Sequence, residues 1–319
     1  MRTHHILFWV LSVFAGAAFA RLPDTTVTYA RIDTLELKLD LYLAGRPAGM
    51  GQPTPIAPAI APFSVPPIVR RPLIIWIHGG GWRGGSRADF SPAWAWIDSG
   101  YSVASLDYRF SQQKKWPAQI NDVKAAVRWL RANADEFGLD TSRFVAWGSS
   151  AGAHLAMMLG LTTRADAFEG AIGDYPDAAT HVRGVIDYYG ATNFLEPNPK
   201  RWAPWSSVGE LLGCGVRKCP ERAYWASPVA YVNPGDVPFL IVHGTIDSTV
   251  PITQAIYLDS VLRAAQVPVQ FYRVEDGHGG PTFTADSTQS WVGNFLRQVL
   301  GPVSPVLPVL GPAKPETAP

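Results

Sequence analysis

The sequence has almost no net charge, few cysteines and no long uninterrupted hydrophobic run. Its 319 residues include 27 lysines and arginines and 26 aspartates and glutamates, which leaves a formal net charge of +1. This balance gives no electrostatic reason to expect nucleic acid or an anionic membrane surface as a partner. The hydrophobic share, 47% of the residues, is enough for one large globular domain, or at most two, with a sizeable core.

An apolar stretch near the N-terminus, residues 6–15, is much shorter than the roughly 20 residues that span a bilayer. Arg2 precedes this stretch and the small residues of AFA, 18–20, follow it, which is the order of regions in a secretory signal peptide. We expect residues 1–20 to be a signal peptide cleaved after Ala20. The mature protein is then secreted or periplasmic, with no integral membrane association. A membrane anchor is the alternative, and the short apolar core argues against it.

The only two cysteines, Cys214 and Cys219, lie close together in the segment CGVRKC. An exported protein meets oxidising conditions, in which such a pair forms a disulfide. We therefore predict a local disulfide that tightens a surface excursion, with two free thiols as the alternative. A zinc site is disfavoured, because no second pair of ligands at a suitable spacing accompanies the cysteines. We expect no metal and no organic cofactor.

Two segments with alternating apolar and polar residues, 26–32 and 35–44, follow the expected signal peptide. Such alternation is typical of half-buried antiparallel strands, which we expect at one edge of a sheet. The segment 46–72 is rich in proline and glycine, which block helix formation, so we interpret it as an extended loop. We expect one domain over residues 21–300 and a disordered proline-rich tail over 301–319.

Short apolar segments alternate with helical patterns from residue 73 onward. Continuous apolar runs of this kind suit parallel strands that are covered on both faces, and they are found at 73–77, 102–108, 144–148, 182–189, 239–243 and 269–275. The clearest helix is predicted over 117–138, with Pro117 in its first turn and Gly138 at its end. A longer excursion over 194–237 contains the two cysteines. The fold class is therefore α/β, with a mostly parallel central sheet, antiparallel N-terminal strands and helices on both faces.

The segment GSSAG, residues 148–152, follows one of these strands and opens a helix. It fits the pattern G-x-S-x-G, in which the central serine occupies a strained turn between strand and helix and presents its hydroxyl. Ser150 is therefore the candidate nucleophile. The flanking glycines are needed because side chains there would collide with the neighbouring strand and helix. The alternative is that Ser150 merely caps a helix.

A serine hydroxyl needs a base within hydrogen-bond reach, and the base needs a carboxylate to orient it. In α/β-hydrolase folds these groups follow in the chain order serine, acid, histidine, and Asp247 and His278 each follow a downstream strand. We predict His278 as the base and Asp247 as its acid. The competing acids are Asp187, Asp276 and, more remotely, Glu275. Of the other histidines, we interpret His154 and His181 as structural or exposed, and His243 as packing in a turn.

Three consecutive glycines follow His78 and precede Trp82 in HGGGWRGG. When a serine attacks an ester carbonyl, negative charge develops on the carbonyl oxygen, and backbone N–H groups that meet it lower the barrier. Glycines let the backbone approach that closely, and an HGGG-type loop supplies such donors together with the residue after the nucleophile. We predict Gly80, Gly81 and Ala151 as the oxyanion donors. A structural or phosphate-binding glycine loop is the alternative, and the absence of a following GK[ST] argues against phosphate.

Together these segments resemble a known group, the secreted α/β-hydrolase carboxylesterases of the HGGG type. The resemblance is greatest to the bifunctional feruloyl and acetyl-xylan esterase-like branch, which is related to the hormone-sensitive-lipase type. It rests on HGGGWRGG, the segment LDYRF to FGLD (106–140), WGSSAGAHLAMMLGL, SPVAYV, PFLIVHGTIDSTVP and EDGHGG. The resemblance implies the same triad and the same oxyanion donors. The sequence departs from the group at Ser149, where an acidic residue is frequent, and at Ala153, where glycine is common.

The resemblance implies hydrolysis of short-chain acyl, acetyl or feruloyl esters, either small molecules or esters linked to polysaccharide. Trp82 is the candidate substrate-binding residue, and Trp202, Trp205 and Trp225 are further candidates for the pocket wall. One alternative is an amide-cleaving relative of the aryl formamidase or peptidase type. The others are a non-catalytic binding protein on the same fold and a scaffold attached to cell-wall polysaccharide. The sequence leaves the oligomeric state open.

Overall fold

The computed structural model describes residues 21–45, 69–163, 168–196 and 206–303. The expected signal peptide, most of the proline-rich segment and most of the tail lie outside the described residues. So do Trp202 and Trp205. Among the helices that are described, none is long and apolar enough to cross a bilayer.

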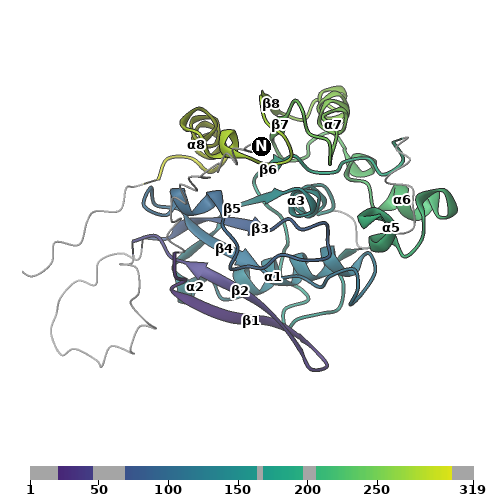
Figure 1. Cartoon of the computed structure of the whole chain (residues 1–319). Coiled ribbons are helices and arrows are strands. Elements are labelled where there is room, and N and C mark those ends of the chain that lie inside the picture. The colour runs from purple at the N-terminus through teal and green to yellow at the C-terminus, as the bar shows by residue number, and fades with distance from the viewer. Residues whose placement is uncertain (1–20, 46–68, 164–167, 197–205, 304–319) are drawn as a thin grey trace, which may run out of the picture.

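An eight-stranded sheet forms the centre of the molecule (Figure 1). Its strands follow the order β1-β2-β4-β3-β5-β6-β7-β8. Their bounds are β1 Thr25–Ile32, β2 Leu35–Tyr42, β3 Arg71–Ile77, β4 Ser102–Leu106, β5 Leu139–Ser149, β6 Val185–Tyr188, β7 Phe239–Gly244 and β8 Val269–Val274. The first two strands pair antiparallel, β2 also pairs antiparallel with β4, and the pairs from β4 to β8 are all parallel. This sheet confirms the predicted architecture, including the antiparallel N-terminal strands.

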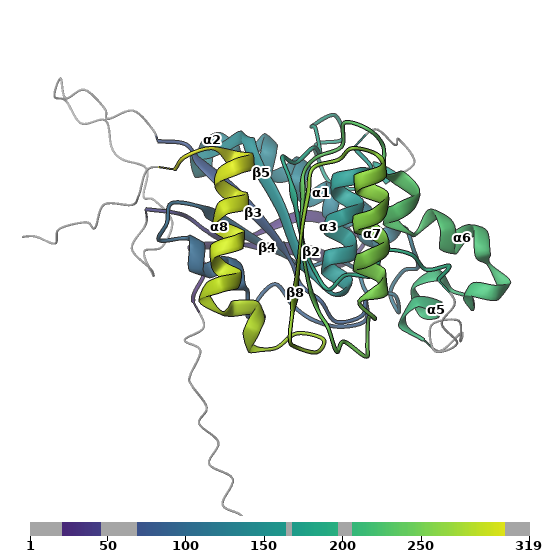
Figure 2. The same ribbon diagram turned by 90° about the horizontal axis from the view of Figure 1, so that it is seen from above.

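Helices cover both faces of the sheet, and each face has its own apolar core. On one face lie α1 (Ala118–Ala132), α3 (Ala151–Leu161) and α7 (Thr253–Ala264), and on the other lies α8 (Asp286–Leu300) with the short helix η1 (Pro92–Trp96) (Figure 2). The alternate residues of β3 divide between the two cores, since Ile75 packs under α1 and α3 whereas Ile74 packs under η1 and α8. Such burial on both sides explains why these strands are continuously apolar in sequence.

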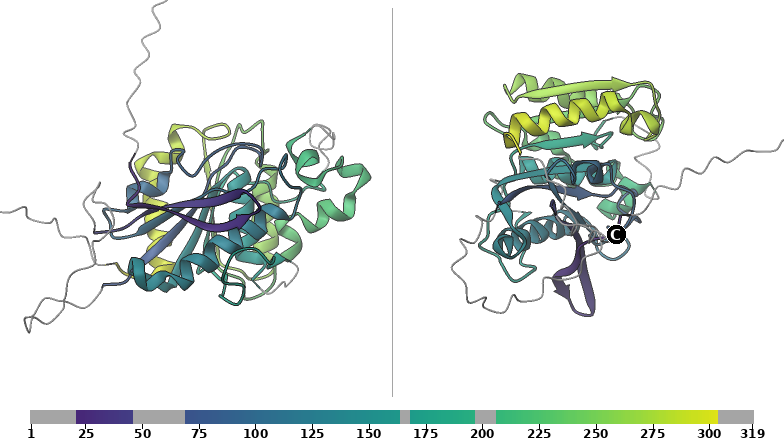
Figure 3. Two further views of the ribbon diagram at one scale, coloured as in Figure 1. Left: turned by 90° about the horizontal axis from the view of Figure 1, so that it is seen from below. Right: turned by 90° about the vertical axis from the view of Figure 1, so that its left-hand side faces the viewer.

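The hairpin of β1 and β2 lies at the opposite edge of the sheet from β7 and β8 (Figure 3). The parallel strands β3, β5 and β7 lie inside the sheet, and β8 forms its other edge. Their carboxyl ends carry the loops that begin at His78, Ser150, Thr245 and Glu275. In open α/β sheets, ligand sites form at this edge.

The predicted helix 117–138 is interrupted. The structure divides it into α1, which ends at Ala132, and a short helix α2 (Ala134–Phe137). Asn133 between them has φ −103° and ψ 14°, and its side chain donates a hydrogen bond to the carbonyl of Trp129. The backbone N–H of Asn133 donates to the same carbonyl at 3.0 Å, so the last turn of α1 is complete and the helix ends at the non-helical φ and ψ of Asn133. Gly138 ends the second piece in the left-handed conformation with φ 63°, as the sequence predicts.

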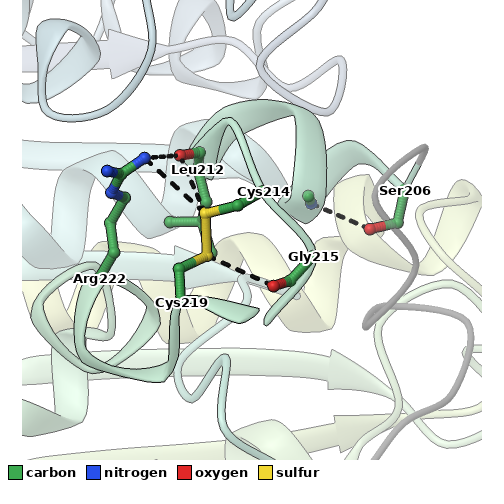
Figure 4. Close-up of a disulfide and its surroundings, with 7 residues drawn as sticks. Ser206, Leu212, Cys214, Gly215, Cys219 and Arg222 are labelled. Atoms are coloured by element: carbon green, nitrogen blue, oxygen red, sulfur yellow. Dashed lines mark hydrogen bonds between the residues drawn. A yellow bond between two sulfur atoms is a disulfide. The ribbon is translucent and has the colours of Figure 1, made fainter. Parts of the chain in front are cut away.

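The excursion between β6 and β7 projects from one end of the molecule and contains α5 (Ser207–Leu212), η3 (Val216–Lys218), α6 (Pro220–Trp225) and η4 (Pro228–Tyr231) (Figures 1 and 2). The predicted disulfide between Cys214 and Cys219 is formed within it (Figure 4). Arg222 lies beside the disulfide and donates a hydrogen bond to the Leu212 carbonyl. The bridge thus ties the end of α5 to the start of α6.

Candidate active site

Ser150 occupies a strained backbone position between β5 and α3. Its φ of 52° and ψ of −117° lie outside the regions that a side chain normally allows. The backbone N–H of Ser150 is held by the Tyr188 carbonyl of the adjacent strand at 2.9 Å. The Ser150 side chain makes no capping hydrogen bond with the helix that follows, so the alternative of a mere helix cap is not what the structure shows.

The two glycines that flank the serine are required by close packing. A side chain on Gly148 would overlap the backbone of Gly152, and one on Gly152 would overlap the carbonyl groups of Ile77 and His78. Helix α3 therefore starts in direct contact with the end of β3. The structure thus agrees with the sequence prediction that a side chain at either position would collide with its neighbours.

Three predicted residues meet at the carboxyl ends of the strands. The Ser150 hydroxyl lies 2.8 Å from Nε2 of His278, and Nδ1 of His278 lies 2.7 Å from Oδ2 of Asp247. With the imidazole neutral, Nδ1–H donates to Asp247 and Nε2 accepts from the serine. This chain of two hydrogen bonds is the arrangement in which a serine can lose its proton to a base.

The carboxylate of Asp247 is buried and held on both oxygens. Its Oδ1 accepts hydrogen bonds from the backbone N–H groups of Thr249 and Val250, each at 2.8 Å. Burial works to raise the pKa of Asp247, but hydrogen bonds from His243, His278 and the backbone outweigh it and hold the pKa well below its usual range. Asp247 is therefore ionised at neutral pH and faces the imidazole as an anion.

The competing acids lie elsewhere. Asp187 is fully buried in β6, where its Oδ1 accepts a hydrogen bond from the backbone N–H of Gly190. Asp276 accepts hydrogen bonds from the backbone of Gly277 and from the backbone and hydroxyl of Thr282, so it ties down the loop after β8. Neither carboxylate makes a hydrogen bond with the histidine in the described residues.

The glycine loop after β3 is held in shape by His78 and Tyr108. The Tyr108 hydroxyl donates to the His78 carbonyl at 3.0 Å, and the two rings stack with their centroids 4.5 Å apart. Burial lowers the pKa of His78, so its imidazole is neutral. Gly80 and Gly81 follow with φ of +103° and +61°, which favour glycine.

These glycines and Ala151 surround the nucleophile. Gly79, Gly80, Gly81 and Ala151 line the same cavity as Ser150. Ala151 is the first residue of α3, and backbone N–H groups in the first turn of a helix have no intrahelical acceptor. The first turn of α3 therefore offers donors of the kind that stabilise an anion, and the glycine loop borders the same cavity.

The cavity has a volume of about 610 Å³ and is open to solvent on one side. Its apolar wall comes from Trp82, Ala191, Val208 and Val250. Hydroxyl groups make up much of the rest, from Ser149, Ser206, Ser207, Ser248, Thr249 and Tyr189. Part of the wall, at 206–208, belongs to the excursion that carries the disulfide. A cavity of this size and mixed lining accommodates a small organic molecule.

Trp82 lines this cavity, but its ring is 3% exposed and is fixed from behind. Its indole N–H donates to Nδ1 of His154 at 3.2 Å, and Nε2–H of His154 donates to the Ala226 carbonyl at 2.8 Å. Burial lowers the pKa of His154 to about 4, so the imidazole stays neutral and can accept from the indole. Trp82 is a rigid wall of the cavity rather than a mobile stacking platform.

Two parts of the site escaped the sequence analysis. Tyr189 lines the cavity and its ring packs against that of His278, with centroids 4.8 Å apart. The wall at 206–208 comes from the start of a short helix, and no local sequence pattern predicts where that helix lies in space.

Trp225, a candidate for the pocket wall, is 48% exposed on α6 and is not among the residues that line this cavity. In the described ranges no group of three histidine, cysteine or acidic side chains is arranged to hold a metal ion.

Comparison with protein families gives a match over most of the central chain. The BD-FAE family matches residues 67–262. Esterase LipC of Mycobacterium tuberculosis is 32% identical over 243 residues, which cover 72% of this chain and 58% of LipC. This chain spans 47% to 58% of the length of three curated relatives from that organism.

Solved structures share the fold over nearly the whole described chain. A truncated carbohydrate esterase from gut microbiota has a TM-score of 0.71 and 27% identity, and the match covers 88% of this chain and 98% of that one. An esterase from the Planctomycetes species Thermogutta terrifontis, Est2, has a TM-score of 0.68 and 25% identity, with 88% and 94% covered. The fold of this chain is thus shared with these two esterases of known structure.

Proposed function

The chain belongs to the BD-FAE family, and we propose that it hydrolyses carboxylic esters through an acyl-enzyme formed on Ser150. The observation that carries this proposal is the pair of hydrogen bonds, 2.8 Å and 2.7 Å long, that links Ser150 through His278 to Asp247. Relatives that are named esterases support the same reaction class.

The reaction begins when His278 Nε2 takes the proton of the Ser150 hydroxyl and the oxygen attacks the ester carbonyl. The imidazolium then returns this proton to the leaving alcohol, and the acyl group stays on the serine. Water repeats the two steps and releases the acid. Asp247 accepts the hydrogen bond from Nδ1–H throughout and stabilises the imidazolium by its negative charge.

The tetrahedral intermediate carries a negative charge on the former carbonyl oxygen. The backbone N–H groups of Gly80, Gly81 and Ala151 are the donors that we assign to this oxygen. Because they are fixed before the substrate arrives, they need no reorganisation during the reaction, and one such donor contributes about 3 to 4 kcal/mol.

Short acyl groups, such as acetyl, or an aromatic acyl group, such as feruloyl, are the substrates that we propose. Trp82 is one of the apolar residues that line the cavity, and the six hydroxyl-bearing residues besides Ser150 offer hydrogen bonds to a polar alcohol. Two similar solved structures are a truncated carbohydrate esterase and a bifunctional GH43-CE protein of Bacteroides eggerthii. Both descriptions are compatible with an ester on a carbohydrate.

The predicted signal peptide would carry the enzyme out of the cytoplasm, to substrates that are small or linked to polysaccharide. The disulfide between Cys214 and Cys219 is consistent with an oxidising compartment. N-terminal sequencing of protein recovered from the periplasm or the medium tests this export, with Arg21 expected as the first residue.

Activity assays on the purified mature protein test the proposed reaction. The substrates are nitrophenyl acetate, nitrophenyl octanoate, methyl ferulate, acetylated xylan and a nitroanilide with the same acyl group. We expect ester turnover that falls by at least about 10³-fold in Ser150→Ala and in His278→Ala. Preference for the nitroanilide would indicate an amide-cleaving enzyme instead, and full turnover by Ser150→Ala would overturn the mechanism.

A further inference from the structure

His243 is a buried imidazole that the proposed reaction does not use directly. It stands near the end of β7, four residues before Asp247, and its side chain is fully buried. Its Nε2 lies 2.7 Å from the carbonyl oxygen of Val250 and 3.4 Å from Oδ2 of Asp247. The sequence interpretation, packing in a turn, does not account for these two contacts.

The proton of this imidazole is located by its partner. A carbonyl oxygen only accepts, so Nε2 of His243 carries the hydrogen and donates it to Val250. The same N–H faces Oδ2 of Asp247, the oxygen that accepts from His278. Val250 in turn donates its own N–H to the other oxygen, Oδ1. His243 and Val250 therefore hold the carboxylate from two sides.

We propose that His243 is a positioning residue for the catalytic acid. Its N–H fixes the loop of residues 247–250 through Val250 and keeps Oδ2 of Asp247 directed at His278. This inference rests on the proposed function, because it assigns His243 a place behind the triad. It predicts that the hydrogen at Nε2, and not the imidazole ring as such, is what the site requires.

The opposite side of the ring supports this assignment. Nδ1 of His243 is buried and makes no hydrogen bond within the described residues. The titratable groups around the imidazole are Asp187 from β6, Asp247 and, beyond it, His278. Since Nδ1 donates to none of them, a side chain that supplies only the donor at the position of Nε2 should replace the histidine.

Three substitutions separate the donor from the ring. Glutamine places its amide N–H₂ near the position of Nε2, asparagine places the same amide near Nδ1, and leucine offers no donor. We expect His243→Gln to retain kcat within about threefold of wild type. His243→Asn and His243→Leu should lose about 10- to 100-fold in kcat, with KM changed less than threefold, because the misplaced acid slows the chemistry and leaves the substrate cavity intact.

Each variant is compared with wild type and with Ser150→Ala in steady-state and burst assays on nitrophenyl acetate, with thermal unfolding as the measure of folding. Equal kcat values for the glutamine and asparagine variants, whether high or low, would overturn the inference. So would a failure of both amide variants to fold, which would make His243 a residue of stability alone. If instead Ser150→Ala keeps full turnover, the proposed function itself is wrong.

Discussion

A side chain on Gly152 would overlap the carbonyl oxygen of Ile77, so the first turn of α3 rests directly on the end of β3. This contact connects the two halves of the candidate site. Ile77 leads into the glycine loop with the proposed oxyanion donors, and Gly152 follows the proposed nucleophile by two residues. A methyl group at position 152 would push α3 away from β3 and would therefore change the distance between the proposed donors and Ser150.

Gly152→Ala should destabilise the protein severely. The added carbon meets backbone atoms that cannot rotate away, so the helix or the strand must shift, at a cost of about 3 kcal/mol or more. Gly84→Ala is the matched control, because an added carbon there has nothing within 4 Å. Urea unfolding measures both variants. Equal stabilities for the two would contradict the packing described for α3 against the end of β3.

His154 should make the stability of the protein sensitive to acid. Its pKa is about 4 in the folded state and near 6.5 when exposed, so below pH 6.5 the unfolded chain binds a proton that the folded chain does not. Stability then falls by about 3 kcal/mol from this group as the pH drops from about 7 to 4.

The test compares His154→Leu with His181→Leu, which removes an exposed histidine whose pKa is also lowered, by partial burial and by Arg131 and Arg183. Unfolding free energies are measured at several pH values between 4 and 7. The His154 variant should be less stable at pH 7, since it leaves the Trp82 indole without its acceptor, yet it should lose less stability on acidification. An unchanged pH slope would mean that His154 is not held neutral.

Asp187→Asn should stabilise the protein at neutral pH. Burial raises the pKa of Asp187 to about 6, while the nearby His243 lowers it. Because the pKa is higher in the folded state than in the unfolded state, the ionised carboxylate lowers the free energy of unfolding. This cost is fully present above about pH 6 and disappears as the pH falls below the pKa of the unfolded state, near 4. The gain at pH 8 should therefore approach about 3 kcal/mol and vanish near pH 4.

Asparagine retains the acceptor for the N–H of Gly190, removes the charge, and places an amide N–H₂ where Oδ2 has no hydrogen-bond partner. Asp122→Asn is the contrasting control. Asp122 is equally buried but forms an ion pair with Arg109 at 2.6 Å, and removing its charge leaves the partly buried guanidinium of Arg109 without a charged partner. Burial also raises the pKa of Asp122, although Arg109 opposes this, so the two variants are contrasted at pH 8, where the Asp122 variant should be destabilised. Similar behaviour of the two variants in pH-dependent unfolding would refute the distinction.

The disulfide should contribute little to global stability. It closes a loop with a sequence separation of 5, for which loop entropy gives about 2 kcal/mol. We expect Cys214→Ser with Cys219→Ser to lower the unfolding free energy by about this amount. Reductant should have the same effect on wild type and none on the double variant, as thermal unfolding would report. A collapse of the whole fold on reduction would show that the excursion supports the core.

Most of the strands can be predicted from the sequence. Their two patterns, continuous apolar runs and alternation of apolar with polar residues, each have a direct physical cause. Strands buried on two faces must be apolar throughout, and the segments at 73–77 and 239–243 are strands in the structure. The alternation over 35–44 likewise marks β2. The break at Asn133 was missed because it lies in the backbone conformation of a single residue, which the apolar pattern along the helix does not reveal.

Part of the candidate site can likewise be predicted from the sequence, and part of it cannot. Ser150, Asp247 and His278 are predictable because their spacing along the chain reflects the order of strands, and the structure brings them within hydrogen-bond distance. Their catalytic roles stay predictions until activity is measured. The contacts of His243 and Tyr189 depend on the packing of adjacent strand ends, which no local motif encodes.

The central claim is that an acyl group passes through Ser150. Its most direct test is acid quenching of the enzyme during turnover of nitrophenyl acetate, followed by mass spectrometry of the intact protein and its peptides. We predict one acetyl group on the peptide that contains Ser150, and none in Ser150→Ala. Acetylation at another residue, or sustained turnover with Ser150 unmodified and dispensable, would contradict the account.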